Sequence, residues 1–119
     1  IEIIEKEKLV DNAKMRGEQL KTGLNELKNK LKIIGDARGI GLLQGLELVK
    51  DKKSKELFPI EAKLGKKITE GLKKRGVWIK VSDYILPIAP PLIISSSEIN
   101  DFLLILEETL IEVQKEVLI

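Results

Sequence analysis

The 119-residue sequence contains no cysteine and no histidine. The lack of cysteine excludes disulfides, and the lack of both excludes the usual zinc ligands and any catalytic nucleophile that is activated by a histidine. Aromatic residues are also scarce, at 3% of the chain, which is too few for a surface that stacks nucleic-acid bases. A self-contained catalytic site of the common kinds is therefore not expected.

Charge of one sign does not dominate, because 21 basic and 19 acidic residues are mixed along the chain. No basic patch of the kind that neutralises phosphates stands out, so the sequence predicts no nucleic-acid partner. The longest uncharged stretch includes residues 85–97, where three prolines and three serines interrupt a run that is far shorter than a membrane span of roughly 20 apolar residues. We therefore expect no membrane contact and a reducing, cytoplasmic location.

Three stretches have the apolar periodicity of amphipathic helices. The first covers residues 9–31, where Gly17 and Gly23 each cost about 1 kcal/mol relative to alanine in an exposed helix. They are interpreted either as points of close packing or as merely tolerated. The second begins at Pro59 and ends near Gly76, which suits a left-handed C-terminal residue. The third opens with a Ser95–Glu98 capping box and places seven apolar residues on one stripe: Ile99, Phe102, Leu103, Leu106, Leu110, Val113 and Val117.

Extended segments lie between these helices. Residues 33–41 and 42–49 indicate two strands or one strand with a bend. Their glycines favour a bulge or a close backbone approach over a phosphate-binding loop, because no helix opens after them. Residues 77–81 and 84–89 predict a hairpin, in which Pro87 favours an edge position. The whole chain therefore predicts one α+β domain, with a small, mainly antiparallel sheet and helices packed on one of its faces.

Two segments resemble a known family. Residues 34–56 read IGDARGIGLLQGLELVKDKKSKE, and residues 89–95 read APPLIIS ahead of Glu98. In combination they resemble the small-domain signature of class III, fold type I, pyridoxal-phosphate-dependent aminotransferases. The resemblance implies that residues 1–119 are the C-terminal small domain of a larger chain. Its large domain, which is absent from this sequence, would bind pyridoxal 5'-phosphate through the catalytic lysine.

The same resemblance implies partners and a role. We expect the small domain to pack on the large domain of its own chain, the full-length protein to form a homodimer, and the substrates to be small-molecule amines and keto acids. The small domain would help to close the site and recognise substrate. The fragment alone would be inactive, and apolar faces meant for the missing domain would make it less soluble than its composition suggests.

Three residues are candidates for substrate binding, and no residue of this chain is a candidate for catalysis or for holding cofactor or metal. Family members have an arginine that suits a carboxylate at one of two positions, which Lys80 and Pro87 occupy in this sequence. Lys80 is therefore the candidate cation, with a solvated residue beside Trp78 as the alternative. Trp78 is interpreted as a channel residue or as core. Arg38 is interpreted as a substrate contact or as a structural partner of Asp36 or of a large-domain carboxylate.

The specificity and the class of function stay open at this point. The sequence G-V-W-I at residues 76–79 favours enzymes of the diaminopelargonate synthase type, which belong to biotin biosynthesis. A 4-aminobutyrate or ω-amino acid:pyruvate transaminase is the alternative within the family. A non-catalytic regulatory or interaction domain is the alternative from another class.

Overall fold

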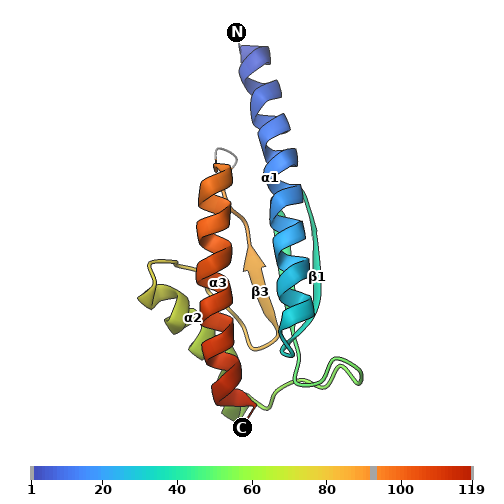
Figure 1. Ribbon diagram of the computed structural model, residues 1–119, viewed down its shortest axis with the longest axis vertical. Coiled ribbons are helices and arrows are strands. Elements are labelled where there is room, and N and C mark those ends of the chain that lie inside the picture. The colour runs from blue at the N-terminus through green and yellow to red at the C-terminus, as the bar shows by residue number, and fades with distance from the viewer. Residues whose placement is uncertain (1, 92–93, 119) are drawn as a thin grey trace.

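The computed structural model describes residues 2–91 and 94–118, and in the first helix the side chains from Lys8 onward. Leu92 and Ile93, which belong to the second segment of the family resemblance, lie outside the described residues. The fold is α+β, as predicted. Helix α1 packs directly on a three-stranded antiparallel sheet, α3 lies beside α1, and α2 packs on α3 (Figure 1).

The three helices supply one side of the core. Helix α1 (Glu2–Lys30) extends beyond the sheet at its N-terminal end, α2 spans Leu64–Lys74, and α3 spans Ser96–Val117 (Figure 1). The predicted capping box is present, since Ser95 accepts from the Glu98 N–H while the Glu98 carboxylate accepts from the Ser95 N–H. The apolar stripes bury ten side chains against the sheet and one another: Leu20, Leu24, Leu27, Leu64, Ile68, Leu72, Ile99, Leu106, Leu110 and Val113.

The sheet has the order β1-β2-β3, with β1 at Ile34–Ile40, β2 at Leu43–Leu48 and β3 at Ile85–Ile88. A two-residue turn joins β1 to β2, and Gly41 adopts a φ of 57° there, which glycine accommodates without steric cost. Pro87 on β3 lies opposite Gly45 on β2, and among the described strands β3 pairs with β2 alone. The predicted edge position of Pro87 is therefore confirmed.

Close packing explains both glycines of α1. A Cβ on Gly17 would lie 2.6 Å from the carbonyl carbon and oxygen of Gly41, so helix backbone meets the backbone of the hairpin turn there. A Cβ on Gly23 would meet the side chain of Leu103 on α3. Of the two interpretations offered by the sequence, close packing is the correct one.

The second helix does not begin at Pro59. Residues Ile60–Ala62 form a short 3-10 turn, the chain turns at Lys63 with a φ of 52°, and α2 starts at Leu64. No side chain from the preceding residues caps α2. Instead the Asp83 carboxylate, which is distant in sequence, accepts a hydrogen bond of 2.9 Å from the N–H of Gly65. The predicted C-terminal residue, Gly76, has a φ of 89°, in the left-handed region.

The predicted hairpin of residues 77–81 with 84–89 is wrong in its first arm. Residues 77–81 form an irregular extended segment that belongs to no strand, and only Ile85–Ile88 joins the sheet. The reason is that α2 takes up the segment's backbone groups. The Val81 N–H donates to the Thr69 hydroxyl at 3.0 Å, and the Val77 N–H donates to the Leu72 carbonyl at 2.9 Å.

Within residues 2–91 and 94–118, no helix is both long and apolar enough to cross a membrane.

Candidate functional site

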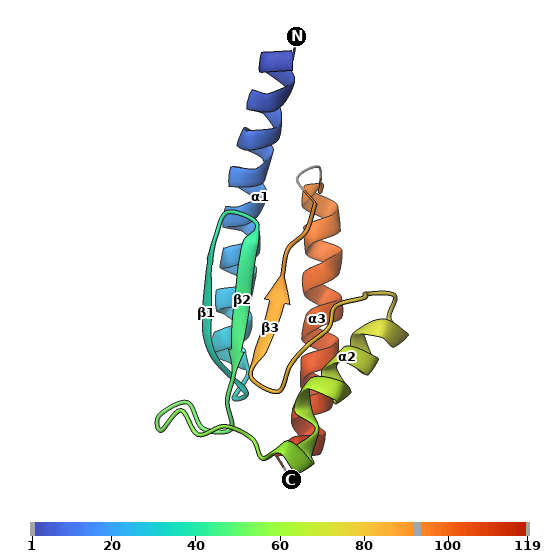
Figure 2. The same cartoon turned by 180° about the vertical axis from the view of Figure 1, so that it is seen from behind.

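The face of the sheet that points away from α1 carries the candidate site. Side chains alternate along a strand, so the buried Leu46 and Leu48 point to the helices, while Leu43, Gly45 and Glu47 point outward. No helix of the described residues lies over this outer face (Figure 2). A hollow of about 610 Å³ lies on it, lined by strand residues and by the loop after β2, with Arg38, Glu47, Lys55, Leu57, Tyr84 and Ile85 among its walls.

Arg38 forms a charged cluster at the edge of this hollow. Its Nε lies 2.8 Å from an Asp36 carboxylate oxygen, and one terminal guanidinium nitrogen lies 2.8 Å from the Glu47 carboxylate. The Lys28 ammonium from α1 adds a contact of 3.3 Å to Asp36. The hydrogen bond from Arg38, together with those from Lys28 and the Ala37 N–H, lowers the pKa of Asp36 to about 2 against the penalty of burial, and its carboxylate raises the pKa of Arg38.

This cluster contains the pair of Arg38 with Asp36, which was one of the interpretations that the sequence left open. Sequence reasoning missed Glu47, although the signal was available. A two-residue turn fixes the register so that Arg38 lies opposite Gly45, and Glu47 follows two residues later on the same face. Arg38 is thus held by two carboxylates of its own sheet.

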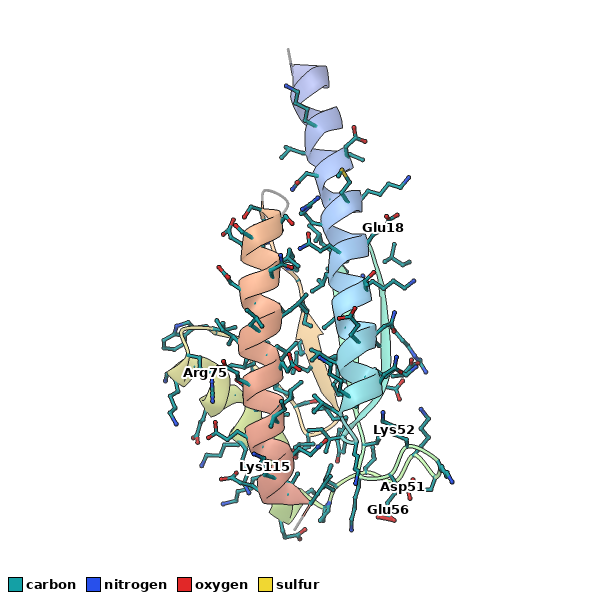
Figure 3. All side chains as sticks on the ribbon, in the orientation of Figure 1. Glu18, Asp51, Lys52, Glu56, Arg75 and Lys115 are labelled. Carbon is teal, nitrogen blue, oxygen red and sulfur yellow. The ribbon has the colours of Figure 1, made fainter. Side chains whose placement is uncertain are left out.

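A second group of charged residues lies in the loop that follows β2, near the C-terminal end of α1. Lys52 and its neighbours Asp51 and Glu56 lie in the loop that follows β2 (Figure 3). The Lys52 ammonium donates to the Lys28 carbonyl in the last turn of α1, which suits the negative end of the helix. Partial burial, with smaller effects from the charges of Lys28 and Lys55, lowers the pKa of Lys52. This lysine therefore ties the loop to α1.

Trp78 and Lys80 lie on the irregular segment after α2, and neither lines the hollow beside Arg38. The Trp78 side chain is 76% exposed, so the core interpretation of this residue is wrong. The Lys73 ammonium lies 4.7 Å from the centre of the Trp78 ring, a cation–π distance. Lys80, two residues further along the segment, is also exposed. Trp78 and Lys80 therefore share one exposed segment, whereas Arg38 lines the hollow on the sheet.

Comparison with known proteins decides the family. Residues 1–110 match the family model described as aminotransferase class-III. The chain belongs to the class III aminotransferase family. Relatives of this class III chain include the adenosylmethionine-8-amino-7-oxononanoate aminotransferase of Methanocaldococcus jannaschii, which is 36% identical over 83% of the chain and 21% of the relative. The alanine–glyoxylate aminotransferase 2 homolog 2, mitochondrial, of Arabidopsis thaliana is 42% identical over 87% and 21%, respectively.

Solved structures agree with this assignment. An (S)-enantioselective omega-transaminase from Thermomicrobium roseum superposes with a TM-score of 0.86 at 35% identity, over 94% of the class III chain and 25% of that protein. The chain thus spans only about a fifth to a quarter of the length of the proteins that it matches. Its α+β arrangement is that of one part of a transaminase.

The described residues do not fit pyridoxal 5'-phosphate, the cofactor that the family implies. Enzymes hold this cofactor through a reactive lysine and groups that bind its phosphate and ring nitrogen. Lys55 lines the hollow, but its ammonium donates to the Gly35 carbonyl at 3.2 Å, and Lys52 is bound to α1. Arg38, the guanidinium at the hollow, is already held by Asp36 and Glu47. No chemical step is therefore assigned to these residues.

Proposed function

We propose that residues 1–119 are the C-terminal small domain of a pyridoxal-phosphate-dependent aminotransferase. The full-length protein would transfer an amino group from a terminal-amine donor to a keto acceptor, and this domain would help to close the site over the substrate. The observation that carries the proposal is the class III match across residues 1–110, in a chain about a quarter as long as its relatives. The large domain of the same polypeptide would bind the cofactor, and the assembly would be a homodimer.

The first experiment tests whether the full-length protein is such an enzyme. We expect it to show the visible absorption of a lysine-bound cofactor and to lose that absorption when an amino donor is added. The isolated chain is the control, and it is expected to stay colourless with added pyridoxal phosphate. A full-length protein that neither binds the cofactor nor consumes an amine would contradict the proposal and favour a non-catalytic interaction domain.

For the donor, we propose the diaminopelargonate synthase type. The resemblance of residues 76–79 and the 36% identity to the Methanocaldococcus enzyme support this choice. The 42% identity to the Arabidopsis alanine–glyoxylate enzyme shows that identity alone does not select a substrate, so a 4-aminobutyrate or ω-amino acid:pyruvate transaminase remains the second candidate. A screen of S-adenosylmethionine, 4-aminobutyrate and ornithine as donors separates them, and the first should give the highest kcat/KM.

We further propose that Lys80 and Trp78 contact substrate in the assembled enzyme. Their support is that both residues are exposed and lie two positions apart on a segment whose own apolar residues, such as Val81, turn inward to the core. The lysine ammonium would bind a substrate carboxylate as a point charge, whereas the resemblance implies a bidentate arginine guanidinium in other members of the family. Arg38 has the weaker case, because two carboxylates already neutralise it, and we assign it a positioning role at the sheet.

Substitution of Lys80 tests this assignment in the full-length enzyme. Lys80→Ala should raise KM for a carboxylate substrate far more than KM for a neutral amine, because only the former loses an ionic contact. Lys80→Arg should restore the carboxylate KM. Lys66→Ala, which removes an exposed lysine on α2, is the matched control and should leave both values unchanged. Equal effects of Lys80→Ala on both substrates would refute the contact.

A further inference from the structure

The segment of residues 77–81, which carries Lys80, has few backbone partners of its own. It leaves the end of α2, turns back past that helix and runs on toward β3 (Figure 2). The Val77 N–H donates to the Leu72 carbonyl at 2.9 Å, but among the described residues the backbone of 78–80 makes no hydrogen bond. An exposed cation on such a segment needs a fixed point nearby if it is to keep one direction.

Thr69 on α2 supplies that fixed point. Its hydroxyl accepts a hydrogen bond of 3.0 Å from the Val81 N–H, which belongs to the peptide group that joins Lys80 to Val81. The same hydroxyl donates to the Gly65 carbonyl at 2.7 Å, and this second bond fixes the rotamer of the threonine. The bound peptide group therefore lies between the buried Val81 side chain and the exposed lysine.

The chain that follows is held against the first turn of α2. The Asp83 carboxylate accepts a hydrogen bond of 2.9 Å from the Gly65 N–H. A Cβ on Gly65 would lie 2.5 Å from the Val81 carbonyl oxygen, so the two backbones are in close contact there. This contact sets the distance of the segment from α2, whereas the hydrogen bond to Thr69 sets the orientation of the peptide group before Val81.

We propose that Thr69 is a positioning residue that holds the Lys80 ammonium in the direction of a substrate carboxylate, an inference that rests on the substrate contact proposed for Lys80. Among the described residues the ammonium has no hydrogen-bond or ion-pair partner, so nothing at its charged end holds it in place. A fixed backbone lowers the entropy cost of ordering the long lysine side chain when substrate arrives. Loss of the fixed point should therefore weaken substrate binding and leave the chemical step intact.

Kinetics of the full-length enzyme test this role. Thr69→Val keeps the shape of the side chain and removes the hydroxyl. It should raise KM for a carboxylate substrate by about 3- to 10-fold, keep kcat within about twofold and leave KM for a neutral amine unchanged. Thr69→Ser retains a hydroxyl and should restore the carboxylate KM.

Thr22→Val is the matched control. The Thr22 hydroxyl also donates to a carbonyl four residues back in its helix, that of Glu18 at 2.9 Å, but it makes no hydrogen bond to another described segment. The control should leave KM for both substrates unchanged. A Thr69→Val enzyme that behaves like Thr22→Val would overturn the positioning role.

A double variant tests whether Thr69 acts through Lys80. Once Lys80→Ala has removed the ammonium, the addition of Thr69→Val should raise the carboxylate KM no further, because the two changes remove one contact. Additive effects would overturn the positioning role, since Thr69 would then influence binding by another route.

Hydrogen exchange of the full-length protein without substrate separates this inference from the proposed function. The peptide that contains the Val81 N–H should exchange several-fold faster in Thr69→Val than in the parent or in Thr22→Val. Unchanged exchange would overturn the inference whatever the kinetics show, and the substrate contact of Lys80 could still stand. Faster exchange, in an enzyme where Lys80→Ala raises KM equally for both substrates, would overturn the substrate contact and with it the positioning role.

Discussion

The two faces of the sheet carry apolar side chains of the same kinds, yet one face is sealed and the other is open. On the inner face Leu46, Leu48 and Leu86 have no exposed surface, because α1 and the rest of the core cover them. On the outer face Leu43 and Ile85 are 70% and 52% exposed. A sheet with one solvated face normally alternates apolar with polar residues. The comparison teaches that the outer face is mixed, because it carries exposed apolar side chains beside a charged cluster: Ile40, Leu43 and Ile85 beside Asp36, Arg38 and Glu47.

The largest expected effect is the loss of stability on substitution of a buried leucine on the inner face. Leu46→Ala should lower the free energy of unfolding by about 3 kcal/mol, because a buried leucine leaves a cavity that its neighbours fill only in part. Leu43→Ala, on the adjacent outward position, should change that free energy of the chain by less than about 0.5 kcal/mol. Urea denaturation of both variants measures the contrast. Similar losses would show that the outer face is also packed within this chain.

The next effect concerns the contact that fixes the sheet to α1. Gly17→Ala should destabilise the chain by about 2 kcal/mol, because the added Cβ would overlap the Gly41 backbone, which has no rotamer to escape into. Gly23→Ala is the control, since the atoms that it meets are the mobile tip of Leu103. It should cost clearly less than Gly17→Ala, because the Leu103 side chain can shift and the better helix propensity of alanine offsets part of the cost. Thermal unfolding followed by circular dichroism distinguishes the two, and a stabilised Gly17→Ala would contradict the close approach.

The smallest expected effect is the pH dependence of the stability that the ion pairs of Asp36 on the outer face contribute. The pKa of Asp36 is lowered from 3.8 to about 2, so its ion pairs stabilise the fold above pH 4 and this contribution is lost as the pH falls from about 4 to about 2. Because the pair is partly exposed and screened, we expect about 1 kcal/mol or less.

Asp36→Asn removes that contribution at every pH. It should therefore be less stable than the parent near neutral pH and equally stable near pH 2, as measured by urea midpoints. A difference that stays constant down to pH 2 would mean that the cluster does not hold Asp36 ionised.

Local signals in the sequence were sufficient for α1, for α3 and for the extended segments that form β1 and β2. The Ser95–Glu98 capping box and the leucine stripe of α3 are short-range patterns, and the structure has both. The glycine at position 41 likewise supplies the backbone angle that a two-residue turn requires. These features depend on residues within a few positions of one another, and a single sequence contains all of that information.

Features that depend on distant partners were not predictable in the same way. The alternation from Val77 to Val81 correctly indicated which side chains turn inward, but the hydrogen-bond partner of the Val81 N–H is Thr69 on α2 rather than a strand. The start of α2 was missed for a similar reason, since its cap, Asp83, comes from beyond the helix. Alternation defines an extended chain, and tertiary contacts decide what that chain pairs with.

For the candidate site, the sequence indicated the pair of Arg38 with Asp36 as one alternative and gave no indication of the hollow. The pair is local, whereas the hollow arises only where the loop after β2 and the start of β3 meet the sheet. The roles of Lys80 and Trp78 toward substrate stay predictions, because the substrate would come from outside this chain. The sequence alone did not reveal that Trp78 is exposed rather than part of the core.

The meeting of Gly17 with Gly41 has a mechanical consequence. Helix α1 has 29 residues and is therefore about 43 Å long at a rise of 1.5 Å per residue, and its leading half projects past the hairpin. At the crossing point the helix backbone lies against the backbone of the hairpin turn with no side chain between them. A tilt of the projecting half would therefore press directly on the turn rather than on side chains that can change rotamer.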